Sequence, residues 1–156
     1  MSKKILGVIG FIIVLIAVGI GSQIGKGVGK SSSKPTNQKF EDIIIEDFVK
    51  FASQYNKKLP MMVDKYTQLD KVTVGPGARV VYHHSLPNYT SSDIDSNWPS
   101  TNLKPQVKSK VCASKGMKKT LQYGGIFVYV YSGNDGIEIE RFEIDRNDCG
   151  YQKLSP

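Results

Sequence analysis

Residues 126–144, IFVYVYSGNDGIEIERFEI, carry the clearest structural signal in the chain. Two stretches of alternating apolar residues flank Asn134-Asp135-Gly136, and an Asp-Gly pair suits a tight turn between antiparallel strands. Strands are therefore predicted over 126–132 and 137–144. The apolar positions of the second strand change face part-way along, which predicts a bulge near Glu140.

The residues before this hairpin predict a helix that leads into it. Apolar residues at helical spacing indicate a helix over about 92–113. Pro99 and Pro105 make that helix irregular because proline lacks a backbone N–H. Residues 117–122 are predicted to form one further turn.

An earlier helix and hairpin are predicted toward the N-terminus. Aromatic and aliphatic residues recur at helical spacing over about 38–56, and Pro60 prevents the helix from continuing. Segments 61–74 and 78–86 have strand character and are separated by Gly75-Pro76-Gly77. The predicted order is α-β-β-α-β-β, an α+β domain over residues 38–156 with a mostly antiparallel four-stranded sheet.

A second kind of segment precedes this domain. Residues 5–24, ILGVIGFIIVLIAVGIGSQI, contain no charge. Twenty helical residues span about 30 Å, the thickness of the hydrocarbon core of a bilayer. We predict a cytoplasmic tip at 1–4, an uncleaved transmembrane helix (a signal anchor) at 5–24 and a Gly/Ser/Lys linker at 25–37. The alternative is cleavage of the segment and secretion.

The predicted location is the bacterial inner membrane, crossed once, with the C-terminal domain in the periplasm or outside the cell. Lys3 and Lys4 favour a cytoplasmic N-terminus, whereas the lysines after residue 24 favour the reverse orientation. Cys112 and Cys149 favour the orientation with the C-terminal domain outside the cytoplasm. In such an oxidising compartment the two cysteines are predicted to form a disulfide.

A stripe of small residues predicts that two copies of the membrane helix pack together. Ala17, Gly21 and Gly25 recur every four residues, a spacing that lets membrane helices approach closely and form a homodimer. The alternative is that the glycines from residue 25 onward belong to a flexible linker.

The net charge of +7 comes from the N-terminal part of the chain. Residues 1–39 contain six lysines and no acid, which leaves 15 basic and 14 acidic residues in 40–156. Lysines beside a membrane segment favour contact with anionic lipid. A nearly neutral domain excludes nucleic acid as the expected partner.

No motif in the chain predicts catalysis, a cofactor or a metal. His83 and His84 are the only histidines, and adjacent residues on a strand point to opposite faces. No serine has the glycine neighbours of a nucleophile elbow, and no glycine-rich loop follows a predicted strand. The chain is therefore not expected to be an enzyme.

The predicted binding surface combines two groups of residues. Lys104, Lys108 and Lys119 lie in a stretch without acids, and Tyr129 and Tyr131 share one face of the last hairpin. The alternatives are that the acids of that hairpin neutralise the lysines, and that the two tyrosines belong to the core.

The stretch LPMMVDKYTQLD at 59–70, followed by Gly75-Pro76-Gly77, Cys112 and Cys149, resembles a group of small exported or membrane-anchored bacterial proteins. The resemblance covers roughly residues 40–150. It implies the same architecture and cysteine pairing, but that group has no established activity, so it supplies no site residues.

A second, weaker resemblance is to type IV pilins and pseudopilins. It rests on a hydrophobic N-terminal helix, a four-stranded sheet and a C-terminal disulfide, and Gly10-Phe11 resembles the pilin processing site. Leu15, however, stands where those proteins carry a glutamate.

Taken together, these features predict a membrane-anchored, non-catalytic binding or accessory protein of the bacterial envelope. Its partner would be a protein or another envelope component. The alternatives are a pilin-like structural subunit and a small periplasmic enzyme.

Overall fold

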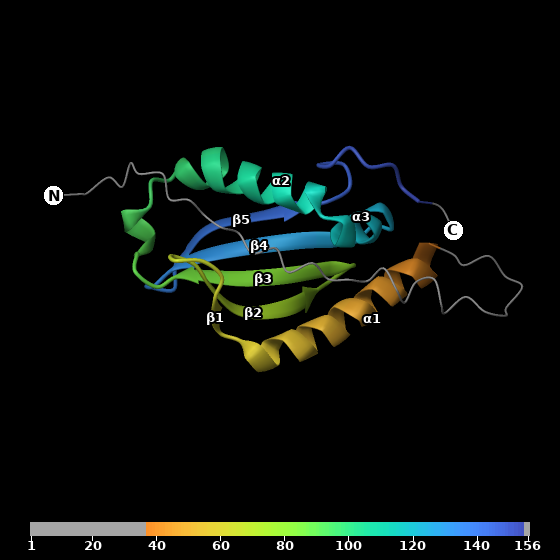
Figure 1. The fold of residues 1–156 in the computed structure, drawn as a ribbon, viewed down its shortest axis with the longest axis horizontal. Helices are drawn as coiled ribbons and strands as arrows, with labels where there is room; N and C mark the ends of the chain where they lie inside the picture. Colours follow the sequence, from red (N-terminus) through yellow and green to blue (C-terminus); the bar gives the residue numbers. More distant parts are fainter. Residues whose placement is uncertain (1–36, 155–156) are drawn as a thin grey trace, which may run out of the picture.

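Strands β3 (Arg79–Leu86) and β4 (Ile126–Gly133) lie side by side at the centre of one five-stranded sheet (Figure 1). The computed structural model describes residues 37–154. The strand order is β1-β2-β3-β4-β5, and β3 and β4 are parallel, with Tyr82 beside Tyr129 in register. The central pair therefore joins two halves of the chain that are distant in sequence.

Antiparallel hairpins flank this central pair. Strand β2 (Gln68–Gly75) pairs with β3, and β5 (Glu138–Ile144) pairs with β4. The predicted turn at 134–136 is confirmed, with Gly136 at φ +75°, a conformation that favours glycine. The predicted bulge is also confirmed, since the pairing of β4 with β5 shifts by one residue next to Glu140.

The predicted number of four strands is wrong, since the sheet has five. Three of its four pairings are antiparallel, and the pairing of β3 with β4 is parallel. Residues 87–125 carry the helices of the second half and return the chain to the end of the sheet where β3 began. A strand that follows such a crossover runs parallel to its predecessor. The domain is α+β, as predicted, but its sheet is mixed.

The fifth strand, β1 (Met61–Met62), comes from a segment predicted as one continuous strand. The carboxylate of Asp64 accepts hydrogen bonds from the backbone N–H groups of Tyr66 and Thr67 at 2.7 and 2.8 Å. This turn interrupts the strand and folds β1 back onto β2. The Asp64 carboxylate accepts the backbone hydrogen bonds that a continuous strand would make with a neighbouring strand.

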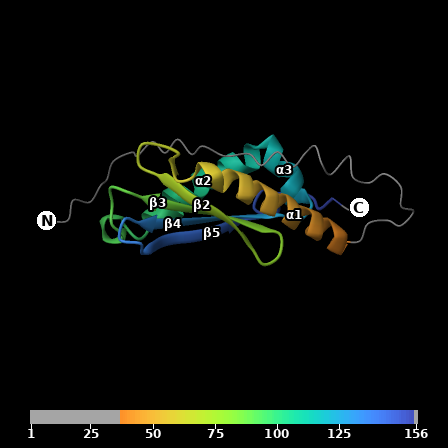
Figure 2. The ribbon, with the colours of Figure 1, turned by 90° about the horizontal axis from the view of Figure 1, so that it is seen from below.

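All the longer helices cover one face of the sheet (Figure 2). Helix α1 (Asn37–Tyr55) matches its prediction and continues into the 3₁₀ turn η2 (Asn56–Lys58). The helix predicted over 92–113 is shorter. A 3₁₀ turn, η3 (Ser91–Asp93), is followed by the π-helical turn η4 (Pro99–Leu103), α2 (Lys104–Ala113) and α3 (Lys115–Gln122).

The core lies between these helices and the sheet. Phe48 of α1 packs edge-on against Phe127 of β4, with ring centroids 6.0 Å apart, and neither side chain is exposed. Val107 and Val111 of α2 and Leu121 of α3 are equally buried. The other face of the sheet has a smaller cluster, Val81, Val128 and Val130, beside a bidentate ion pair between Arg79 and Glu143.

The segment after β5 is fixed to the helices. Cys112 of α2 is joined to Cys149, with Cα atoms 5.3 Å apart. The Tyr151 hydroxyl donates to the backbone oxygen of Cys112, and the Leu154 N–H donates to the Gln122 oxygen at 3.0 Å. The C-terminal segment therefore forms a wall beside α2 and α3.

Several predictions lie outside the described residues: the tip at 1–4, the membrane helix at 5–24, most of the linker and the small-residue stripe. Within 37–154, none of the helices is both long enough and apolar enough to span a bilayer.

We expect Phe48→Ala to lower the free energy of unfolding by about 3–5 kcal/mol, because it leaves a cavity where α1 meets β4. The adjacent Val49→Ala is the matched control, since Val49 is 51% exposed and its truncation should change stability by less than about 0.5 kcal/mol. Urea unfolding of both variants measures the difference. Equal effects would mean that α1 does not dock as described.

Candidate binding site between helices α1 and α2

Five rings form a continuous stack on the helix-covered face of β3, β4 and β5. Tyr82 stacks on Tyr129 at a centroid distance of 5.3 Å, and His84 stacks on Tyr131 at 4.7 Å. Phe142 of β5 continues the stack 5.6 Å from Tyr129. Each stacked pair faces its partner because residues in register on neighbouring strands share a face.

We call Tyr82, His84, Tyr129 and Tyr131 the tyrosine floor. All four side chains are buried: His84 is 8% exposed and the three tyrosines are each 3% exposed. Burial raises the pKa of each tyrosine hydroxyl above its ordinary value. Burial also lowers the pKa of His84 to about 4, although a backbone hydrogen bond with Val130 and the charge of Asp70 oppose this in part. The floor is therefore uncharged at neutral pH.

Three polar atoms of the floor are buried without a hydrogen-bond partner among residues 37–154. They are the hydroxyl oxygens of Tyr82 and Tyr129 and the Nδ1 atom of His84. Buried polar groups in folded proteins are nearly always paired, and each unpaired one costs about 1–3 kcal/mol. Three such atoms lie on neighbouring side chains of one aromatic stack, so the floor has hydrogen-bonding capacity that the described residues do not use.

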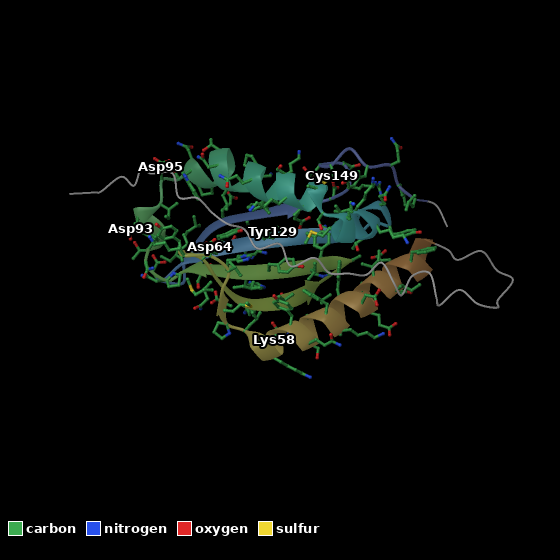
Figure 3. The ribbon with its side chains drawn as sticks, in the orientation of Figure 1. Lys58, Asp64, Asp93, Asp95, Tyr129 and Cys149 are labelled. Carbon is green, nitrogen blue, oxygen red and sulfur yellow. A yellow bond between two sulfur atoms is a disulfide. The ribbon has the colours of Figure 1, made fainter. Side chains whose placement is uncertain are left out.

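The two long helices border the floor. Helix α1 packs on β2 and β3 while α2 packs on β5, and Tyr129 lies between them (Figure 3). Phe51 of α1 makes an edge contact with Tyr82 at 6.3 Å. One turn earlier on the same flank, Asp47 has a carboxylate oxygen that is also buried without a partner in the described residues. Burial raises the pKa of this carboxyl.

The structure does not bring the predicted binding residues together. Tyr129 and Tyr131 are buried and do not lie on an exposed face, because β4 is central and its aromatic face lies between α1 and α2. Lys108 lies 3.8 Å from Asp148, on the flank of α2 that faces the C-terminal segment. Lys104 is one turn away on that flank, and Lys119 is exposed on α3. Lysines and tyrosines therefore do not form one surface.

The two histidines lie on opposite faces of the sheet, and the aspartates considered with them accept hydrogen bonds from neighbouring groups. His84 faces the helices, whereas His83 lies on the other face and hydrogen-bonds to Thr73 at 2.9 Å. Asp64 is engaged in its turn, and Asp70 accepts from Ser85 at 3.1 Å. Within residues 37–154, no three His, Cys, Asp or Glu side chains are grouped as metal ligands.

Sequence reasoning missed Tyr82, His84 and Asp47 as members of the site. The alternation of 79–86 does place Tyr82 and His84 on one face, but their contact with β4 depends on the parallel pairing. Asp47 is an acidic residue among the apolar residues on that flank of α1, and this exception to the pattern could have indicated a site.

No family model matches the sequence, and no curated protein matches it. Solved structures do match in fold. A pilotin of the type 2 secretion system of Vibrio vulnificus, EpsS, has a TM-score of 0.60 at 14% identity, over 74% of this chain and 99% of that chain. The type II secretion system pilotin AspS of Vibrio cholerae has a TM-score of 0.55 at 16% identity, over 72% and 97%.

A third structural neighbour is PA3611 of Pseudomonas aeruginosa, a protein assigned as secreted. It has a TM-score of 0.59 at 16% identity, over 78% of this chain and 99% of that chain. At these identities the three likenesses show a shared fold.

We expect Tyr129→Phe to raise the free energy of unfolding of the isolated protein by about 1 kcal/mol, because it removes a buried hydroxyl without a partner. Tyr131→Phe is the matched control, since the Tyr131 hydroxyl is not among the unpartnered atoms. Urea unfolding measures both. A loss of stability in Tyr129→Phe would show that its hydroxyl is already satisfied.

We expect stability to fall between pH 6.5 and pH 4. Over this window the unfolded chain protonates His84, whose ordinary pKa is 6.5, while the folded chain does so only near pH 4. The shift corresponds to about 3 kcal/mol, present in full above pH 6.5. His84→Gln should remove most of this pH dependence and His83→Gln should keep it. Similar slopes in the two variants would refute the assignment to His84.

Proposed function

We propose that this chain is a non-catalytic accessory protein of a bacterial envelope assembly, and that it binds a protein segment of that assembly over the tyrosine floor. The observation that carries the proposal is the group of three buried polar atoms without partners on one aromatic stack. A bound segment that supplies hydrogen bonds to them would remove their cost.

The chemistry of the floor favours a neutral, partly apolar partner. Two tyrosine hydroxyls can each donate and accept a hydrogen bond, and their rings offer apolar area at low cost in side-chain entropy. None of these groups is a nucleophile activated by a base, so the site suits recognition and not reaction. Aromatic anchors at the centre of an interface are typical of binding hot spots.

The structural comparisons support this role. Two of the solved structures with the same fold are pilotins of type II secretion systems, and a third is a protein assigned as secreted. Pilotins serve a secretion assembly, and we carry that kind of role to this chain as a proposal. We also propose that the domain lies outside the inner membrane, where Cys112 and Cys149 can be oxidised.

The remaining predictions concern residues before 37. Anchoring by 5–24, contact with membrane lipid, a homodimer through Ala17, Gly21 and Gly25, and the pilin-like alternative all stay predictions.

Photo-crosslinking in cells tests the proposed interface. A photoreactive residue at Gln54 of α1 or Gln106 of α2 would sit on the flank of its helix that borders the floor. Asn56, which directly follows α1, and Cys112 of α2 occupy the opposite flanks. We expect both positions to form adducts with the same envelope protein. Lys71, exposed on the other face of the sheet, is the control and should form none.

Two results would contradict the proposal. Adducts of equal yield at residue 71 would mean that contact is not confined to the helical side. An adduct within the chain, from residue 54 or 106 to residues 5–24, would mean that the chain covers its own floor. Tyr82→Phe combined with Tyr129→Phe should lower the intermolecular yield several-fold, because each lost hydroxyl removes a hydrogen bond to the partner.

A further inference from the structure

A pocket of about 210 Å³ opens at the end of the sheet where α1 begins, away from the tyrosine floor. We propose that this pocket binds a phosphate group, carried by a phospholipid headgroup or by free phosphate. The proposal does not depend on the protein partner proposed above.

Four separate parts of the chain build the pocket. Helix α1 contributes Phe40, and the turn between β2 and β3 contributes Gly77. Tyr123 follows α3 and stacks on Phe40 with parallel rings 5.1 Å apart. Arg146 and Lys153 come from the C-terminal segment that the Cys112–Cys149 link holds against α2. The pocket is therefore a tertiary feature with a fixed wall.

The cations of the pocket are only partly neutralised. Arg79 is held by Glu143, with nitrogen–oxygen distances of 3.1 and 3.3 Å, and by the Pro76 oxygen. Arg146 and Lys153 also line the pocket, and no carboxylate within residues 37–154 forms an ion pair with either of them. Two unpaired cations in one concave site attract an anion.

The donor set favours phosphate among anions. A guanidinium group forms bidentate hydrogen bonds with phosphate oxygens, a lysine ammonium adds a further charge, and the Tyr123 phenol can donate as well. A volume of about 210 Å³ is below the range of about 300–1,000 Å³ for drug-sized ligands, so it suits a headgroup-sized ligand.

Among residues 37–154, Glu41 is the one carboxylate that lines the pocket. Its charge opposes that of the cations and should weaken the binding of a simple anion. This gives the proposal a second test of opposite sign, because removal of the Glu41 charge should strengthen phosphate binding while removal of the cations weakens it.

The position of the pocket is compatible with a lipid source. Phe40 and Glu41 lie in the first turns of α1, directly after the point where the described chain begins, and residues 25–36 connect this point to the uncharged segment at 5–24. Twelve residues reach at most about 40 Å, which would keep this end of the domain near a bilayer if the segment is inserted.

Titration of the full-length protein, held in dodecyl maltoside micelles that contain no phosphate, tests the proposal. The probes are inorganic phosphate and the short-chain lipid dihexanoyl-phosphatidylglycerol, each added at constant ionic strength. The readout is the ¹H–¹⁵N NMR shift of Gly77 and Gly124 in the pocket, against Gly136 at the opposite end of β4. We expect the pocket glycines to shift saturably and Gly136 to stay unchanged.

Three variants make the result specific. Arg146→Gln with Lys153→Gln should weaken binding by at least about tenfold, since two charged donors are lost. Lys104→Gln with Lys115→Gln, which removes the same charge outside the pocket, should leave binding unchanged. Glu41→Gln should tighten phosphate binding by about threefold, an effect expected of a nearby like charge.

The outcomes separate the sources and can overturn the proposal. Saturation by the lipid at lower concentration than by inorganic phosphate assigns the site to a headgroup, and equal saturation assigns it to free phosphate. Shifts that do not saturate, that include Gly136, or that respond equally to both charge-matched double variants would refute the pocket as a phosphate site.

Discussion

The parallel pairing of β3 with β4 is the interaction on which the rest of the structure depends. It places Tyr82 beside Tyr129 and His84 beside Tyr131, so that four rings share one face. The crossover that makes the pairing parallel also places α2 on the same face of the sheet as α1, with α1 over β2 and β3 and α2 over β5. The aromatic stack and its two bordering helices therefore arise from one topological feature.

The local elements could be predicted from the sequence, and the long-range pairing could not. The hairpin at 126–144, its turn and its bulge follow from alternation and an Asp-Gly pair, which act over a few residues. The pairing of β3 with β4 depends on where the helices between them pack, and no short pattern encodes that. The burial of Tyr129 could not be predicted for the same reason. The alternation of residues in its strand is identical whether the aromatic face is exposed or covered.

The candidate site shows a tension between stability and binding. An apolar ring would stabilise the floor of the isolated domain, yet the chain carries hydroxyl groups and an imidazole there. Residues that break a local rule without compensation are expected at functional sites. The phosphate pocket lies at the other end of the domain, so a protein partner and an anionic ligand could bind without competing.

A crystal structure of the protein in complex with its cross-linked partner, at a resolution that shows ordered water, tests the binding role of the tyrosine floor. We expect polar atoms of the partner to lie within hydrogen-bond distance of the Tyr82 and Tyr129 hydroxyls and of His84 Nδ1. Hydrogen bonds from those three atoms to side chains of residues 37–154 or to enclosed water, with the partner bound elsewhere, would rule out this role of the floor.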